Sequence, residues 1–440
     1  MHDSLRGSPA QGLGGATAAF FLGLAAVALY GPTAVELRES MGLTAFYMGL
    51  LVGAPQLTGS LLRIPFGAWA DEIGGRLPIM ILLGLSVAGL VGFTSVMFLY
   101  YPDGLTADLF PIVILCGLLS GCGIATFSVG VPQASYWYRQ REQGKALGIY
   151  GGLGNTAPGI FTLLLPFALA IFGLAGSYAA WTVFLIVGLI AYAVIGKDAY
   201  YFQLRRQGVA HEQAEQVARE AGQELFPSGN AKTALAISAK NSNTWALVFL
   251  YFTSFGGFLA LTAWFPSYWR EYQGFDIRWA AVLGGVGFSL LASFVRIYGG
   301  IIADKFGGER IAMLGFALVL AGALCLCFTS VFAIALAGEL LIGIGMGIAN
   351  AAVFKLVARY VPDAVGGAAG WVGGLGAFGG FLMPPILGLF VDALGPSGYA
   401  QGFVIYVVAA LMCIAVTRRL MNRASTEAEG TGDELVAKPA

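Results

Sequence analysis

Long apolar runs separated by short polar turns dominate the chain and predict a protein that crosses a membrane many times. A helix needs about 20 apolar residues to cross a hydrocarbon core of about 30 Å. The pattern predicts twelve such spans, at residues 14–35, 45–70, 77–99, 110–136, 146–173, 178–196, 244–266, 280–303, 311–333, 335–358, 366–392 and 401–417. The predicted fold class is an all-α integral membrane protein with twelve transmembrane helices.

Two polar stretches divide this pattern. The first separates six spans from six, and its sequence between Asp198 and Phe226 predicts helix at the membrane surface. We interpret it as a linker, with a regulatory role as the alternative. The second is the polar C-terminal end, whose composition is typical of disorder. The predicted organisation is an N-terminal six-helix bundle at 1–196, a cytoplasmic linker at 197–243, a C-terminal six-helix bundle at 244–423 and a disordered tail at 424–440.

Lysine and arginine predict the orientation of the spans. With the N-terminus inside, 19 of the 24 basic residues fall on the cytoplasmic side, and the outer loops hold only Arg38, Arg270 and Arg278. Positive charge favours the cytoplasmic side, so both termini are expected in the cytoplasm. The expected location is the plasma membrane, which in a bacterium is the inner membrane.

Composition agrees with this class and narrows the chemistry. The chain is 58% hydrophobic and 11% charged, whereas soluble domains are about 25% charged. Its net charge of zero gives no reason to expect a nucleic-acid partner. The five cysteines lie in apolar segments without metal-site spacing, and His2 and His211 lie outside the spans. We therefore expect no metal, no cofactor and no histidine proton relay. The N-terminus also lacks the plan of a signal peptide.

Two internal matches indicate that the halves are repeats. The segment from Arg63 to Gly75 parallels the segment from Arg296 to Gly308, with an offset of 233. A glycine-rich segment, 144–154, parallels 366–376 with an offset of 222. Six spans per half predict parallel repeats around an axis normal to the membrane, with a substrate site between the two pseudo-symmetric bundles near the midplane.

Each half carries one arginine inside a span. Arg63 lies eight residues before Asp71, and Arg296 eight residues before Asp304, which places each about 12 Å from the inner interface. An arginine at the centre of a membrane helix costs about 2.5–3.5 kcal/mol on insertion scales. No carboxylate repeats between the halves as its counter-ion; the nearby candidates are Glu36, Glu39, Glu339 and Asp392. We interpret the arginines as an anion site, and the alternative is that helix carbonyls or Glu339 satisfy them.

The residue type favours an oxyanion. A guanidinium group is planar, permanently charged and offers paired N–H donors that match oxyanions. Polar and small residues recur at helical spacing with each arginine, which suits a cavity or a close helix contact. They are Gln56, Gly59, Ser60 and Gly67 in the first half, and Gly285, Ser289, Ser293 and Gly300 in the second.

The combination resembles a known family. The loops Gly67…Asp71…Gly74-Gly75-Arg76 and Gly300…Asp304…Gly307-Gly308…Arg310 resemble those of the major facilitator superfamily. The arginines of spans 2 and 8 and the glycine-rich segments GIYGGLGNTAPG (148–159) and GWVGGLGAFGGFLMPP (370–385) resemble its nitrate/nitrite porter family, as does the aromatic stretch from Tyr251 to Phe258. The resemblance implies the major facilitator fold.

The resemblance also implies the roles of individual residues. Arg63 and Arg296 are expected to grip the oxyanion, Phe127 and Phe255 to sandwich it, and Asn155 and Tyr251 to hydrogen-bond to it. Gly151 and Gly373 are expected to line the site with backbone. Span 11 departs from the pattern, because Ala377 stands where the repeat of Asn155 would be.

The resemblance implies nitrate and nitrite as the substrates of a secondary transporter that works by alternating access. The arginine pair predicts exchange of the two ions, because two like charges without an anion between them should resist closure. The expected partners are the two anions and the lipid bilayer, with the monomer as the functional unit. Nitrate–proton symport is the alternative, with Glu36, Glu39 or Lys355 as candidates for the proton. Formate, another monocarboxylate or a phosphate ester also suits arginines. A non-transporting anion sensor lacks an output domain, and no catalytic constellation favours an enzyme.

Overall fold

The computed structural model describes residues 5–139, 142–227 and 231–436, and within them every regular element is a helix. The N-terminal half contains α1 (Pro9–Ala25), α2 (Ala34–Met41), α3 (Ala45–Leu61), α4 (Arg63–Ile73), α5 (Arg76–Tyr100), η2 (Ala107–Leu109), α6 (Phe110–Gly121), η3 (Cys122–Ala125), α7 (Thr126–Ser135), α8 (Gln143–Gly154) and α9 (Ala157–Ile195). The linker contains α10 (Tyr200–Arg206), α11 (His211–Glu220) and α12 (Ala231–Lys240).

The C-terminal half repeats this plan. It contains α13 (Ser242–Tyr251), η5 (Phe252–Gly256), α14 (Gly257–Ser267), η6 (Tyr268–Tyr272), α15 (Ile277–Val282), η7 (Leu283–Leu290), α16 (Leu291–Phe306), α17 (Gly308–Cys327), α18 (Phe332–Tyr360), η8 (Pro362–Ala364), α19 (Val365–Ala377), α20 (Gly379–Leu394), η9 (Gly395–Ser397), α21 (Gly398–Gln401) and α22 (Val404–Val436). The last helix thus runs to Val436 through most of the segment expected to be disordered, and 437–440 lie outside the described residues.

Ten helical stretches of the described chain are long and apolar enough to cross a membrane. One of them, Ala146–Ile195, holds two predicted spans, because Gly173 has a φ of 66° and breaks α9 into two arms. The first predicted span is not among the ten, since α1 is only 17 residues long. Counting α1 and both arms of α9 recovers the twelve predicted crossings.

The first span differs from its predicted extent, 14–35. Helix α1 ends at Ala25, and turns occupy 26–33 before α2 begins. Pro32 has no N–H to continue a helical ladder. The neighbouring Gly31 packs so tightly that a methyl group there would lie 2.6 Å from Cα of Ala263, in the other half. The helical conformation is therefore interrupted where the chain contacts the opposite bundle.

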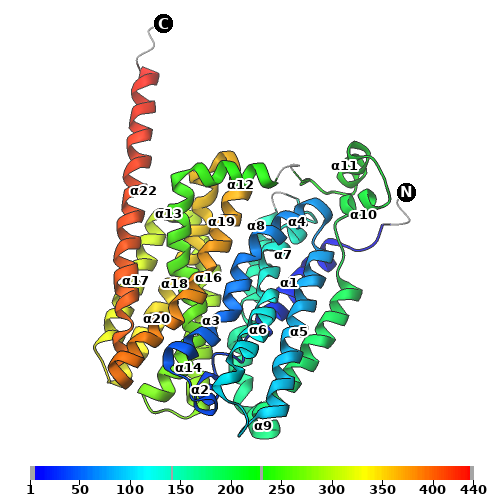
Figure 1. The fold of residues 1–440 in the computed structure, drawn as a ribbon. Helices are drawn as coiled ribbons and strands as arrows, with labels where there is room; N and C mark the ends of the chain where they lie inside the picture. The colour runs from blue at the N-terminus through cyan, green and yellow to red at the C-terminus, as the bar shows by residue number, and fades with distance from the viewer. Residues whose placement is uncertain (1–4, 140–141, 228–230, 437–440) are drawn as a thin grey trace.

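The two halves stand side by side with both termini at one end (Figure 1). We call this end, which also carries α10, α11 and α12, the terminal end, and the end that carries α2 the distal end. Helix α12 packs on α19 at the terminal end, where Trp371 donates a hydrogen bond to the Leu235 carbonyl at 3.0 Å. The predicted helical character of 198–226 is confirmed by α10 and α11.

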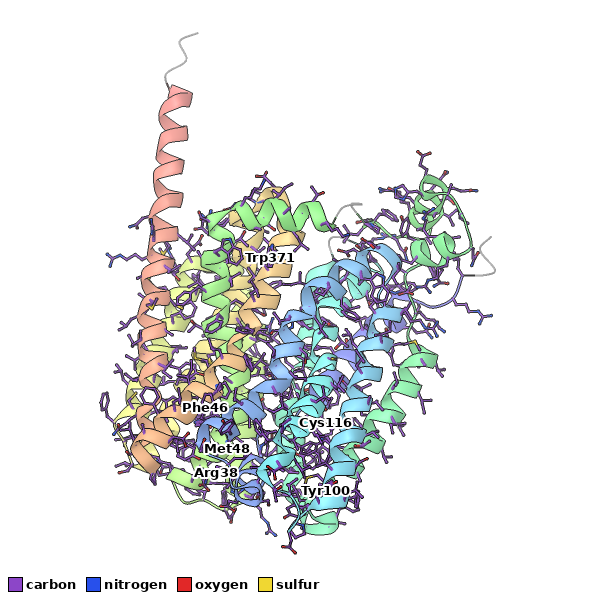
Figure 2. The ribbon with its side chains drawn as sticks, viewed as in Figure 1. Arg38, Phe46, Met48, Tyr100, Cys116 and Trp371 are labelled. Carbon is purple, nitrogen blue, oxygen red and sulfur yellow. The ribbon has the colours of Figure 1, made fainter. Side chains whose placement is uncertain are left out.

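The buried apolar side chains form one large cluster in each half. The C-terminal cluster also takes in Met48 of α3, so α3 belongs to the interface between the bundles (Figure 2). Contact there is close because glycines line it: a methyl group on Gly49 would lie 2.5 Å from the Pro384 carbonyl oxygen of α20, and one on Gly53 2.7 Å from that of Phe381. Small residues are what allow helix backbones to approach in this way.

Candidate functional site

Arg63 lies where α3 meets α4, and its side chain is 0% exposed. Nε donates a hydrogen bond to the Gly59 carbonyl at 3.2 Å, and Nη1 donates to the Gly373 carbonyl of α19, across the interface, at 3.0 Å. Nη2 is buried without a hydrogen-bond partner. Because buried polar groups normally have a hydrogen-bond partner, this N–H group is a candidate to bind a ligand.

Arg296 occupies the equivalent position on α16 and is half-buried. Its Nη2 donates a hydrogen bond to the Tyr251 hydroxyl at 3.3 Å, while Nη1 is buried without a partner. Each arginine therefore donates to protein groups through part of its guanidinium and has one buried terminal nitrogen without a partner.

Phe127 and Phe255 bring the two arginines into one site. Their ring centroids are 6.2 Å apart with planes inclined by 30°, and both rings are buried. Cζ of Arg63 lies 4.9 Å from the Phe127 centroid and 5.1 Å from that of Phe255. For Arg296 these distances are 6.0 Å and 5.4 Å. Both cations thus lie within cation–π range of the same pair of rings, one from each half.

Local structure fixes these rings. Phe255 lies in η5, a π-helical turn, and Tyr251 stacks on it with centroids 5.0 Å apart. Single π turns inside helices are frequent at functional sites. Phe127 lies at the start of α7, where its carbonyl accepts a hydrogen bond from the Tyr150 hydroxyl at 2.7 Å. The structure thus brings five of the predicted site residues together: both arginines, both phenylalanines and Tyr251.

The remaining predicted residues occupy the glycine-rich helices. The Gly373 carbonyl accepts from Arg63, as described, whereas a methyl group on Gly151 would meet no atom within 4 Å, so open space adjoins that position. Asn155 donates its amide to the Gly151 carbonyl at 2.8 Å rather than to a site residue, and its Oδ1 is buried without a partner. Ala377, its counterpart in the repeat, ends α19.

No carboxylate forms an ion pair with either arginine in the described part of the chain. Glu339, the counter-ion considered from sequence, accepts a hydrogen bond from the Trp269 indole at 3.0 Å instead. The alternative was that helix carbonyls satisfy the arginines. Two carbonyls do accept hydrogen bonds from Arg63, whereas Arg296 donates to the Tyr251 hydroxyl instead. The site can therefore take up an anion without displacing a carboxylate.

Sequence reasoning missed the closure of the distal end. Arg38 of α2 pairs with Glu271 of η6 at 2.6 Å, and Arg270 pairs with Glu36 at 2.5 Å. Both pairs join the two halves. A signal existed in the sequence, because Arg38 and Glu271 are separated by 233 residues, the offset that relates the two buried arginines.

Two further residues near the site are polar groups in otherwise apolar spans: Ser293 was expected from its spacing with Arg296, whereas Asn350 was missed. The Ser293 hydroxyl donates a hydrogen bond to the Asn155 carbonyl at 3.1 Å and so links α16 to the junction of α8 and α9. Asn350 of α18 is buried with Oδ1 unpartnered, one turn before Phe354, whose ring lies 5.5 Å from that of Tyr251. Isolated amides and hydroxyls in these spans were the available signal.

Comparisons with known proteins agree with this architecture. The family model described as Major Facilitator Superfamily matches residues 16–384 and 279–437. The chain is 28% identical to "Probable nitrate/nitrite antiporter NarK1" of Thermus thermophilus, over 96% of this chain and 94% of the relative. It is 30% identical to "Nitrite extrusion protein" of Bacillus subtilis, over 81% of this chain and 80% of the relative.

A solved structure supports the fold independently. The xylose transporter XylE from E. coli, in a partially occluded inward-open conformation, superposes with a TM-score of 0.72 at 15% identity and covers 94% of this chain and 99% of its own. At that identity the likeness concerns the fold alone. The predicted major facilitator fold is confirmed, and the chain is a multi-pass membrane protein. It belongs to the Major Facilitator Superfamily and, within it, to the nitrate/nitrite porter family.

Proposed function

We propose that this protein exchanges nitrate for nitrite across the membrane by alternating access, with the anion held by Arg63 and Arg296. The observation that carries the proposal is that two arginines lie within cation–π range of the same two aromatic rings and each has one buried nitrogen without a partner. Relatives that cover almost the whole chain bear names of nitrate/nitrite antiporters and transporters, which supports the choice of ion.

The geometry favours a small planar ion. The rings of Phe127 and Phe255 are 6.2 Å apart, and a flat ion in van der Waals contact with both requires about 7 Å. The two rings therefore need to move apart by only about 1 Å to admit such an ion, and changes in their side-chain rotamers can supply this movement. Bulky substrates such as phosphate esters require a much larger displacement. In the bound state we expect Tyr251 and Asn155 to add hydrogen bonds, with Gly151 and Gly373 lining the slot.

The charges favour exchange. The Cζ atoms lie 5.1 Å and 5.4 Å from the same Phe255 centroid, so at most about 10.5 Å separates them. Two like charges at that distance repel by about 1.6 kcal/mol at an effective dielectric constant of about 20. A monovalent anion between them adds two attractions that outweigh this repulsion, because it lies closer to each cation than the cations lie to each other. Closure with an ion bound is therefore favoured over closure without one, and that difference couples import to export.

We further propose the topology that the basic residues predict, with the terminal end in the cytoplasm and the protein in the plasma (inner) membrane. The protein acts as a transporter rather than an enzyme or a sensor, and as a monomer. In this orientation the distal ion pairs close the outer face.

Counterflow in proteoliposomes tests the proposal. Vesicles loaded with nitrite should take up labelled nitrate much faster than empty vesicles, at a rate independent of a pH gradient. Uptake into empty vesicles that a pH gradient accelerates contradicts exchange and supports nitrate–proton symport. Formate-loaded vesicles separate the remaining alternative, since formate should drive nitrate uptake only if the slot accepts carboxylates.

A further inference from the structure

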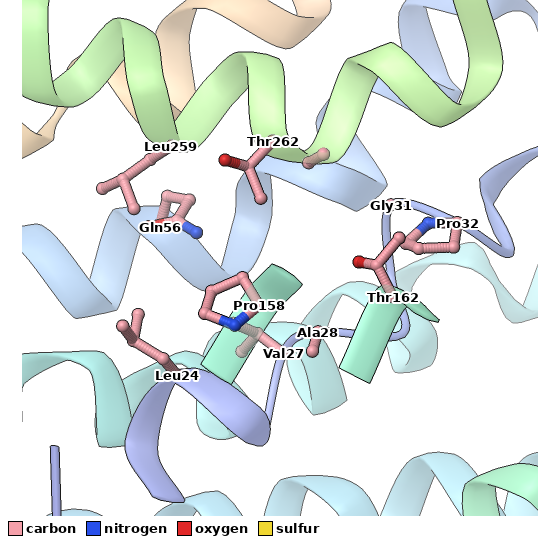
Figure 3. Close-up of a pocket in the computed structure, with 11 residues that line it drawn as sticks. Leu24, Val27, Ala28, Gly31, Pro32, Gln56, Pro158, Thr162, Leu259 and Thr262 are labelled. Atoms are coloured by element: carbon pink, nitrogen blue, oxygen red, sulfur yellow. The ribbon is translucent and has the colours of Figure 1, made fainter. Parts of the chain in front are cut away.

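A cavity lies between the bundles, separate from the arginine pair (Figure 3). Its walls come from the end of α1 and the turns after it, from α3 and α9 of the N-terminal half, and from α14 of the C-terminal half. The volume in which the centre of a water molecule can lie is about 30 Å³, roughly twice what one water molecule needs. Residues of both halves thus enclose a volume that fits a small ion.

The cavity lies two helical turns from the anion slot on three different helices. Gln56 precedes Arg63 by seven residues, Thr162 follows Asn155 by seven, and Thr262 follows Phe255 by seven; all three line the cavity. Seven residues correspond to about two turns and about 10 Å along a helix, so each polar residue lies about 10 Å along the chain direction from its site residue. In every case the step leads towards the distal end.

Two residues that line this cavity have polar atoms without partners. Gln56 is 7% exposed, and its Oε1 is buried without a hydrogen bond. The hydroxyl of Thr262 is likewise buried and unpartnered. Figure 3 shows the Gln56 amide nitrogen directed towards the space between the lining residues. Leaving a buried polar group unsatisfied costs about as much as a lost hydrogen bond, so these groups indicate a ligand or ordered water. Because an amide oxygen only accepts, the donors available to an anion are the Gln56 amide nitrogen and the hydroxyls of Thr162 and Thr262.

We propose that this cavity is a second anion-binding station, in which Gln56, Thr162 and Thr262 bind the transported oxyanion on its way between the arginine pair and the distal face. The inference rests on the proposed function, because it assigns a second position to the same ion. Neutral donors suit the task. A transit site must bind well enough for an ion to enter and weakly enough for it to leave.

The position of the distal ion pairs supports a station on the path. Pro32 lines the cavity, and Glu36 lies only four residues further along the chain. Thr262 lines it from the other half, and Arg270 lies eight residues further on. Glu36 and Arg270 form one of the two ion pairs that close the distal end. The cavity therefore lies between the arginine slot and the distal closure.

Bromide, a monovalent anion with a strong anomalous signal, tests the proposal in crystals of the full-length protein. We expect two anomalous peaks, one at the arginine pair and one between Gln56 and Thr262. The double variant Gln56→Leu/Thr262→Val removes the polar atoms and keeps the volume nearly constant. It should weaken bromide binding in the cavity at least about tenfold, since a hydrogen bond to a charged group contributes that much to affinity, and at subsaturating bromide the cavity peak should fall by the same factor.

The matched control is Thr253→Val, which removes a hydroxyl from the same span but not from the cavity, because Thr253 donates to the Phe249 carbonyl. It should keep both peaks. The arginine peak reports folding in every crystal. A wild-type crystal with the arginine peak alone overturns the station, and so does a cavity peak that persists in the double variant, which indicates an adventitious ion only. Absence of the arginine peak contradicts the proposed function instead.

Discussion

Replacing Arg63 by lysine separates charge from geometry in the proposed slot. Lysine keeps the positive charge but has one terminal nitrogen where arginine has two. In the structure Arg63 uses Nη1 on the Gly373 carbonyl and leaves Nη2 for a ligand. A lysine nitrogen occupies only one of these positions, so either the contact between the bundles or the contact with the ion is lost.

The size of the effect follows from the lost donor. A hydrogen bond to a charged group contributes about 1.5–3 kcal/mol. Losing one contact to the ion should therefore weaken nitrate binding by about 10- to 150-fold. The Kd can be measured from the nitrate dependence of thermal unfolding, because a ligand stabilises the state that binds it. Exchange in proteoliposomes should fall with affinity at subsaturating nitrate.

Arg38→Lys is the matched control, because it is the same substitution at an arginine that pairs with Glu271 outside the slot. It should leave nitrate affinity within about twofold of wild type, as expected for a partly exposed ion pair. If Arg63→Lys also stays within about twofold, recognition by the planar fork is wrong and charge alone binds the ion.

Three further predictions concern other parts of the molecule. Tyr251→Phe removes a hydroxyl that accepts from an arginine but keeps the stacked ring, so nitrate affinity should fall about three- to tenfold while thermal stability changes little. Glu339→Gln should leave nitrate–nitrite exchange and its pH profile unchanged; loss of a proton-driven component would contradict pure exchange. Gly49→Ala should lower thermal stability by about 1–3 kcal/mol through collision with a carbonyl of α20, whereas Gly148→Ala, with no neighbour within 4 Å, should not.

Apolar runs were sufficient to predict most of the fold. A segment that crosses the membrane must form its backbone hydrogen bonds internally, as a helix, and its side chains must be apolar over the whole crossing. The break in the first span was not predictable from hydropathy alone. It depends on Gly31 meeting Ala263 of the other half, a tertiary contact. The π-helical turn that holds Phe255 is likewise set by packing, since its composition is that of an ordinary apolar helix.

The candidate site was predicted unevenly. The internal repeat identified both arginines, because a costly residue that occurs twice at equivalent positions requires a reason. The cavity around Gln56 and Thr262 was not predictable, because its walls come from four regions of the chain that meet only in the fold. Arg38 and Glu271 are separated by the offset of the repeat, so the sequence contained a signal for their pairing.

Direct hydrogen bonds across the slot bear on how an ion controls the transition. Arg63 donates to the Gly373 carbonyl and Ser293 donates to the Asn155 carbonyl, and each bond joins opposite halves. Rocking of the halves must stretch or break these bonds, and opening of the distal face must also break the ion pairs there. An anion that accepts from both arginines gives Arg63 a replacement partner when its bond to Gly373 breaks. Without the ion that N–H loses a partner in a buried place, which is unfavourable. In the proposed exchange mechanism the bound ion therefore lowers the free energy of the transition between the two open states. This difference, together with repulsion between the arginines, is the physical reason we propose for a dependence of transport on an ion in each direction.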